Sequence, residues 1–490
     1  MFSIIFLILS FLKGFGALDL SNKDGLFYIY NWTHLVDRYA RYTDRPHGVD
    51  FPDWTWNYGS GKCIQKETME YKTSQFGLFK IMYERALLDP RRTMDPENAT
   101  SFLIPYDFGM DATFFETNGR MRRTGCPLAA EALKLLNSSK YFHSNHGHDH
   151  TLIVSVNQNM NYFFHAKNCL QVFHQCWNCT KLSIDEYMFI AKDRNFELKN
   201  RGINWHAVPF PADYHFDSSI EQIPMWERKQ ENRSYLVSFT GSPKRYNAVS
   251  TSIRLALLEQ CHNLSHICTS GNYHHHTALD LVKNLYEKQH SVFCLQPPGD
   301  MPTRKSVFDT ILSGCIPVFF NPLTARLMYE WHLGQSGWEE IGFNFDSVSE
   351  AEAIIEQRLN VVKALMKIAE EQPQLILEKR QKIRELAYQL QYSLINFDNS
   401  TNRSTVSQKT IDGKKLLDAY DISMKWLLDI HSGRKTHDRI SSYAECAQIH
   451  GAKNQMLQTA EWCNISTLRD PFHPPSVVSY LYQWEKKKTA

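Results

Sequence analysis

One stretch, residues Ser291–Phe320, constrains the fold more than any other part of the chain. It reads SVFCLQPPGDMPTRKSVFDTILSGCIPVFF. The apolar run Val292–Leu295 predicts a buried strand, and a loop containing Pro-Pro-Gly follows it. Ser306–Ser313 predicts a short helix that ends at Gly314, before a second buried strand at Ile316–Phe320. A strand, a helix and a strand in this order predict a parallel βαβ unit in an α/β domain.

The loop of this unit has the features of a phosphate site. It follows the carboxyl end of a strand, where open parallel sheets bind ligands, and it leads into a helix whose free N–H groups favour phosphate. Arg304 and Lys305 add full positive charge at that helix start. Asp309 would repel phosphate but is suited to ribose hydroxyls. The alternative from spacing alone is that Arg304 and Asp309 form an exposed ion pair or a capping arrangement.

The chain is long enough for two domains, because it has 490 residues and 43% of them are hydrophobic. Three short apolar runs in the first half predict buried strands: Phe27–Tyr30, Phe102–Tyr106 and Leu152–Val156. Phe76–Leu87 predicts a helix between them. The polar stretch Phe210–Arg233 lacks periodicity, and Tyr235–Phe239 predicts the first strand of a second unit. We therefore divide the chain into residues 21–225, 226–435 and an extension, 436–490.

Further helices are predicted after the second βαβ strand. Ser347 and Glu350 have the spacing of a capping box. Apolar residues between Ile355 and Ala369 recur at helical spacing, so the sequence predicts one amphipathic helix there, interrupted by Pro373.

The N-terminus predicts entry into the secretory pathway. Ile4–Leu12 is an apolar block followed by small residues, as in a signal peptide. The block is shorter than the roughly 20 residues of a bilayer span, so residues 1–20 are interpreted as a cleaved signal peptide or an uncleaved signal anchor. Nine glycosylation sequons fit a lumenal chain: Asn31, Asn98, Asn137, Asn178, Asn232, Asn263, Asn399, Asn402 and Asn464.

Cysteine usage agrees with an oxidising lumen. Several of the eleven cysteines are closely spaced and predict disulfides: Cys169, Cys176 and Cys179; Cys261 and Cys268; Cys446 and Cys463. The odd count leaves at least one thiol free or intermolecular. Cys176 and Cys179 also have the spacing of a redox CxxC motif, but a structural disulfide is the favoured interpretation.

The charge balance argues against nucleic acid as a partner. The chain has 54 Lys and Arg against 52 Asp and Glu, a net charge of +2. Such a chain has no overall basic field of the kind that binds nucleic acid.

Three strings in this sequence resemble the signature of exostosin-like glycosyltransferases, especially the plant xyloglucan galactosyltransferase branch. They are FCLQPPGD, TRKSVFD and GCIPVFF. The resemblance also includes Tyr235–Arg245 in the second half. It extends more weakly to the first half, and so covers roughly Leu26 to His332; the weaker matches are Phe27–Tyr30, Tyr71–Phe76, Phe102–Asp111 and the pair Asp149–His150. The chain differs from that branch at His148, where Arg is common, and at Met301-Pro302.

The resemblance implies a GT-B fold, in which two Rossmann-like domains face a cleft. It also implies an inverting transfer from a UDP-sugar without an obligatory metal or other cofactor, and the lack of an Asp-x-Asp motif on a loop after a strand agrees with this. Residues that match the donor-binding motifs are expected to hold the nucleotide sugar: Gly241, Ser242, Lys244, Arg245, Gly299, Asp300, Thr303, Arg304, Lys305 and Asp309.

The first domain should supply the catalytic base that removes a proton from the acceptor hydroxyl. His146 to His150 is its densest titratable cluster, so Asp149 or His150 is the predicted base, with Asp111 in reserve. Two alternatives stay open. The pair can simply satisfy backbone groups or each other, or the His-x-His-x-His run can bind zinc.

The expected function is transfer of a sugar, galactose by analogy, from a UDP-sugar to a glycan or glycoprotein acceptor in polysaccharide biosynthesis. The expected location is the Golgi lumen, as a type II membrane protein or a secreted one if the signal is cleaved. The alternatives are a glucuronosyl- or xylosyltransferase of the same fold, or a noncatalytic glycan-binding protein.

Overall fold

The computed structural model describes residues 25–35, 57–155, 171–185 and 204–434, apart from short gaps within these ranges. The predicted signal segment 1–20 and the extension 436–490 lie outside the described residues. Within the part that is described, no helix combines the length and apolar character needed to cross a membrane.

The first half of the chain forms a six-stranded parallel sheet in the order β10-β9-β8-β5-β1-β4. Its strands are β1 (Phe27–Ile29), β4 (Arg92–Thr93), β5 (Ser101–Leu103), β8 (His150–Val154), β9 (Thr180–Ser183) and β10 (Trp205–Ala207). Its helices are α3 (Gly77–Leu87), α4 (Phe108–Thr113), α5 (Ala129–Ser138) and α6 (Lys140–Ser144). The three predicted buried strands are confirmed, because β1, β5 and β8 pair within this sheet.

The second half forms a five-stranded parallel sheet in the order β12-β11-β13-β14-β15. Its strands are β11 (Tyr235–Thr240), β12 (Cys268–Gly271), β13 (Ser291–Gln296), β14 (Ile316–Phe319) and β15 (Phe343–Asn344). Its helices are α9 (Ala248–Asn263), α10 (Ala278–Gln289), α11 (Lys305–Leu312), α12 (Glu330–Leu333), α13 (Gly337–Ile341), α14 (Val348–Ile355), α15 (Val361–Glu371) and α16 (Pro373–Leu386).

Short hairpins and 3-10 turns complete the described elements. The hairpins are β2 (Lys62–Gln65) with β3 (Glu70–Lys72), β6 (Phe115–Thr117) with β7 (Arg120–Arg122), β16 (Ile395–Asp398) with β17 (Arg403–Val406), and β18 (Thr410–Ile411) with β19 (Lys414–Lys415). The 3-10 turns are η3 (Asn57–Gly59), η4 (Pro96–Asn98) and η7 (Ala387–Leu390).

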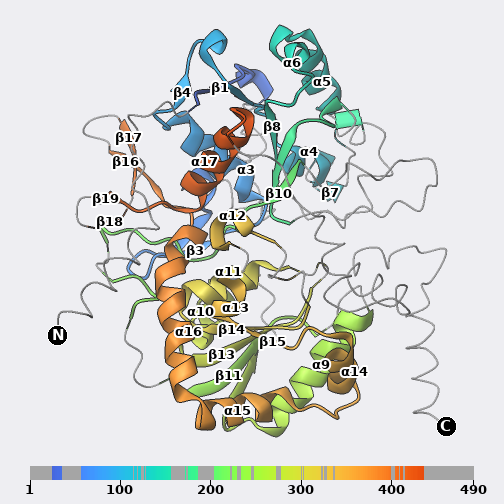
Figure 1. The fold of residues 1–490 in the computed structure, drawn as a ribbon, viewed down its shortest axis with the longest axis vertical. Coiled ribbons are helices and arrows are strands. Elements are labelled where there is room, and N and C mark those ends of the chain that lie inside the picture. The colour runs from blue at the N-terminus through green and yellow to red at the C-terminus, as the bar shows by residue number, and fades with distance from the viewer. Residues whose placement is uncertain are drawn as a thin grey trace.

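The α/β fold with two Rossmann-like parallel sheets is thus confirmed. The two sheets occupy the upper and lower halves of Figure 1. The predicted βαβ unit is also confirmed: β13 and β14 pair in parallel on either side of α11, and Gly314 follows the helix with a φ of 66°, a conformation that favours glycine.

One predicted helix is wrong, because Ile355 and Ala369 belong to two helices. The capping box of Ser347 and Glu350 is confirmed at the start of α14, but α14 ends at Ile355 and α15 begins only at Val361. Gln260 of α9 holds the turn between them, donating to Leu359 O at 2.9 Å and accepting from Val361 N at 2.8 Å. Apolar periodicity continues across the turn because both helices pack on one core.

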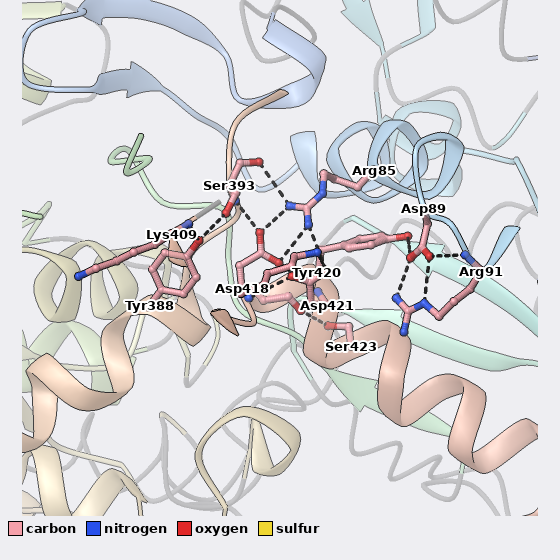
Figure 2. Close-up of polar contacts among 12 residues, drawn as sticks. Arg85, Asp89, Arg91, Tyr388, Ser393, Lys409, Asp418, Tyr420, Asp421 and Ser423 are labelled. Carbon is pink, nitrogen blue, oxygen red and sulfur yellow. Dashed lines mark hydrogen bonds and ion pairs between the residues drawn. The ribbon is translucent and has the colours of Figure 1, made fainter. Parts of the chain in front are cut away.

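Helix α17 (Ala419–His431) follows the second sheet in sequence but lies with the first sheet in the upper half of Figure 1. His431 fixes one end, with Nδ1 at 2.7 Å from Ser101 Oγ and Nε2 at 2.9 Å from Thr180 Oγ1. At the other end, buried Arg85 of α3 contacts Asp418 and Asp421, as Figure 2 shows. The chain therefore connects the two domains twice.

Two disulfides are described in full. Cys261–Cys268 confirms a prediction, whereas Cys294–Cys315, which links β13 to the residue before β14, was not predicted. Cys126 is also disulfide-bonded. The disulfide interpretation is wrong for Cys176 and Cys179, which are buried free thiols. A thiol behaves as a small apolar group, so packing beneath the sheet accommodates both side chains without a covalent bond.

Candidate donor site

Arg304 lies where two strands of the second sheet end. It is the N-cap residue of α11, and its guanidinium donates to Pro297 O at 3.0 Å, just after β13, and to Thr240 O at 3.3 Å, the last residue of β11. Glycines make room for it: a Cβ on Gly241 would lie 3.2 Å from Arg304 Nη2, and one on Gly299 would lie 3.4 Å from Arg304 Cγ. The structure therefore brings these three predicted donor residues together.

Arg254 of α9 is a further basic residue at this edge, and the sequence analysis missed it. Its side chain is fully buried and donates to Ser242 O at 2.7 Å and to Pro298 O at 2.9 Å. It thereby joins the loop after β11 to the loop after β13. An arginine within a helix usually faces solvent, so no local pattern marks Arg254. Lys244, Arg245 and Asp300, also predicted donor residues, lie outside the described residues.

Lys305 and Asp309 belong to a buried cluster of polar side chains that includes residues of both domains. Lys305 Nζ contacts Asp213, in the segment after β10, and Asp309 Oδ2 at 3.1 Å. Asp309 is 1% exposed and also accepts from the Asp213 amide at 2.8 Å. These contacts exclude the interpretation of Arg304 and Asp309 as an exposed ion pair. The ribose role of Asp309 stays a prediction.

Burial and neighbouring charges act in opposite directions on Lys305 and Asp213. Burial alone would lower the pKa of Lys305, but Asp213 and Asp309 outweigh it and raise that pKa. Lys305 therefore remains a cation. Burial, assisted by Asp309, raises the pKa of Asp213 to about 7 in spite of Lys305.

Thr303 connects the donor loop to the first domain through Tyr329. Tyr329 Oη lies 2.6 Å from Ile184 O and 2.9 Å from Thr303 Oγ1. Because a carbonyl only accepts, the tyrosine donates its single proton to Ile184 and accepts from Thr303. Ile184 directly follows β9, so the carboxyl ends of strands from both sheets meet at this loop.

Asp149 and His150, the two residues predicted as the catalytic base, lie at the amino ends of the strands of the first sheet, opposite the edge that faces the donor loop. His150 is the first residue of β8; its Nδ1 lies 2.6 Å from Asp149 Oδ1 and its Nε2 lies 2.7 Å from Tyr30 Oη. The ring is fully buried and stacks on Phe102 at 4.8 Å. The carboxyl end of β8, at Val154, is about 13 Å from His150 at a rise of roughly 3.3 Å per residue. The structure does not bring this pair to the donor loop, and its catalytic role stays a prediction that these contacts do not support.

Other acidic residues do lie at the edge facing the donor loop. The reserve candidate Asp111, in α4, accepts from Tyr106 Oη at 2.5 Å and from Leu128 N at 3.0 Å. Asp107 accepts from Ser155 Oγ at 3.2 Å, and Asp185 directly follows Ile184. All three carboxylates are buried. The sequence did not single out Asp107 and Asp185, because only the strand order shows that both lie at the same edge of the first sheet.

No cluster of three or more His, Cys, Asp or Glu side chains among the described residues is arranged to hold a metal ion. The charged groups that converge on the donor loop are instead basic side chains from α9 and α11. Arg304 and the amino end of α11 form a surface suited to a diphosphate, and the fully buried Arg254 holds the adjoining loops.

Two Rossmann-like parallel sheets define a fold of the GT-B type, and basic side chains lie at the carboxyl ends of the second sheet. The chain belongs to the exostosin family, because residues 28–357 match the Exostosin GT47 domain. These residues therefore form a glycosyltransferase domain.

Several curated relatives come from Arabidopsis thaliana. A probable xyloglucan galactosyltransferase, GT20, is 29% identical over 78% of this chain and 62% of its own length. The xyloglucan-specific galacturonosyltransferase 1 is 28% identical over 65% of this chain and 46% of its own length. The chain thus spans less than two thirds of each of these relatives. Among solved structures, the pneumococcal O-GlcNAc transferase GtfA in complex with UDP and GlcNAc matches 57% of this chain and 62% of its own, with 11% identity and a TM-score of 0.28.

Proposed function

We propose that this protein transfers a single sugar from a UDP-sugar to a glycan acceptor, with inversion at the sugar carbon. The observation that carries the proposal is the position of Arg304, which spans the carboxyl ends of β11 and β13 at the amino end of α11. A leaving diphosphate at this point would be stabilised by the guanidinium and by the helix N–H groups. Membership of the exostosin family supports the same reaction class.

The proposal requires no metal ion for departure of the diphosphate. Arg304 now donates to two carbonyl oxygens, and a charged phosphate is a stronger acceptor than either carbonyl. We expect one of these bonds to be exchanged for a bond to the diphosphate. Lys244, Arg245 and the backbone of Gly241 and Ser242 are proposed to complete the donor site.

The base is proposed to come from the first-domain edge that faces the donor loop. Asp185 is the preferred residue, because it directly follows Ile184, whose carbonyl contacts the Tyr329–Thr303 pair of the donor side. Asp111 is the second candidate at the same edge. An inverting displacement needs such a carboxylate to accept the proton of the acceptor hydroxyl on the side opposite the diphosphate.

Galactose is the proposed sugar, and a xyloglucan-like glycan the proposed acceptor, by analogy with the relatives' names. One relative is named a galacturonosyltransferase, so a uronic acid is the second candidate donor, beside glucuronosyl or xylosyl transfer. The Golgi lumen is the proposed location, either as a type II membrane protein or in secreted form. The nine sequons and the apolar N-terminal block support it.

A donor panel tests the proposal directly. The secreted protein is incubated with UDP-galactose, UDP-galacturonate, UDP-glucuronate and UDP-xylose, with and without xyloglucan oligosaccharides, and UDP release is measured. We expect acceptor-dependent release with one donor, a loss of at least 100-fold in Arg304→Ala, and full activity in Arg358→Ala, whose side chain is 63% exposed and remote in sequence. Binding of UDP without release from any donor would favour the noncatalytic glycan-binding alternative.

A further inference from the structure

A fully buried lysine lies beneath the donor loop. Lys288, near the end of α10, donates to the side-chain oxygens of Asn284, one helical turn earlier, and Thr240, the last residue of β11. Both acceptors are neutral. Among the described residues, no carboxylate forms an ion pair with this ammonium group. A buried cation held only by neutral oxygens lacks the charge compensation that usually accompanies burial.

Thr240 joins Lys288 to the donor site. Its hydroxyl accepts from Lys288, and its carbonyl accepts from Arg304 Nη2 at 3.3 Å. A Cβ on the next residue, Gly241, would lie 3.2 Å from Arg304 Nη2 and 3.3 Å from Arg254 Nη1. A single residue therefore separates the buried ammonium from the guanidinium proposed to bind the diphosphate.

The charges around Lys288 come from several elements. Arg304, Lys305 and Asp309 face it from α11, and Glu287 is its neighbour on α10. Arg233 donates to the Lys288 carbonyl, and Arg254 reaches the same strand ends from α9. Lys305 is already compensated by Asp213 and Asp309. The remaining cations give the donor loop an excess of positive charge.

The buried environment of Lys288 disfavours the charged form of its side chain. Burial is the main cause that lowers the pKa of Lys288, to about 7 when the nearby charges are included: Asp309 and Glu287 raise it, whereas Arg304 and Lys305 lower it. Near neutral pH the side chain is therefore partly deprotonated. A bound diphosphate would add negative charge beside the same cluster and reverse the balance.

We propose that Lys288 is a positioning residue of the donor site that takes up a proton when the donor diphosphate binds. The inference rests on the proposed function. Because the bound state holds more protons than the free state, donor affinity must fall as the pH rises above neutrality. We expect a Kd about fivefold to tenfold weaker at pH 8.5 than at pH 7.

Calorimetry with UDP-galactose tests the proposal. Each phosphate of this donor is a diester that stays ionised between pH 6 and 9, so the ligand itself contributes no proton. Titrations at pH 7.5 in two buffers of different ionisation enthalpy give the number of protons taken up. We expect about half a proton or more for the wild-type protein. Lys288→Met should show almost none and should lose the pH dependence of Kd.

Two further variants separate this role from a structural one. Lys288→Arg, which stays charged, should bind without proton uptake and keep tight binding at pH 8.5. Asp213→Asn removes a second group beside the donor loop whose pKa lies near neutrality, and this variant should still take up the proton. Wild-type binding without uptake, or uptake retained in both Lys288 variants, would overturn the inference alone. Absence of binding by every UDP-sugar would overturn the proposed function, and this inference with it.

Discussion

The buried contact between Arg85 and Asp418 gives the sharpest stability prediction. Asp418 is fully buried, its carboxylate lies 2.5 Å from Arg85 Nη1, and it also accepts from the backbone amides of Ser393 at 2.8 Å and Asp421 at 3.0 Å (Figure 2). Asp418→Asn keeps the shape of the side chain but leaves the guanidinium without its main counter-charge. Breaking a buried pair from one side typically costs about 3–5 kcal/mol.

Thermal unfolding followed by circular dichroism measures this loss. For a domain of this size, each kcal/mol lowers Tm by about 2–4 °C, so we expect Asp418→Asn to unfold roughly 6–20 °C below the wild-type protein. The matched control is Glu84→Gln, which removes a partly exposed pair with Lys80 on the same helix and should cost about 0.5 kcal/mol or less. A Tm for Asp418→Asn within about 2 °C of wild type would refute the anchoring of α17 through Arg85.

Three further predictions concern other buried groups. Burial and Asp418 raise the pKa of Asp421 to about 6, above its unfolded value, so the stability contributed by the protonated carboxyl is lost as the pH rises through 6. Asp421→Asn should therefore raise Tm relative to wild type more at pH 8 than at pH 5. The reverse order would contradict this prediction. Replacing Cys294 and Cys315 with Ala should lower the free energy of unfolding in urea by about 3 kcal/mol, whereas an unchanged midpoint would argue against the bond. His150→Gln should lower Tm but leave kcat within about threefold of the wild-type value, because the ring lies at the sheet edge away from the donor loop. A 100-fold loss of kcat in the folded variant would instead support His150 as the catalytic base.

The donor loop was predictable because its signals are local. The apolar runs around Ser291–Phe320, the Pro-Pro-Gly turn and Gly314 each act within a few residues, and together they fix a strand, a loop, a helix and a strand. The positions of Arg304 and Lys305 at the start of α11 follow from the same pattern. Their partners do not, since Thr240 and Asp213 are distant in the chain.

The acceptor side was not predictable, because it depends on long-range order. His150 is a titratable residue beside a strand, and only the direction of β8 in the sheet places it at the edge remote from the donor loop. Arg85 and Asp418 are separated by 333 residues, and no nearby sequence pattern indicates that they form a pair. The bond between Cys294 and Cys315 likewise requires β13 and β14 to be neighbours. Such pairs emerge from topology rather than from periodicity.

Binding of UDP to the donor loop tests the central claim most directly. For a Kd of about 10 µM, 1 mM UDP adds about 2.7 kcal/mol to the stability of the folded protein, which raises Tm by several degrees. We predict this rise for the wild-type protein and for the surface control Arg358→Ala, and its loss in Arg304→Ala. A wild-type Tm unmoved by millimolar UDP, or an equal rise in Arg304→Ala, would contradict the account.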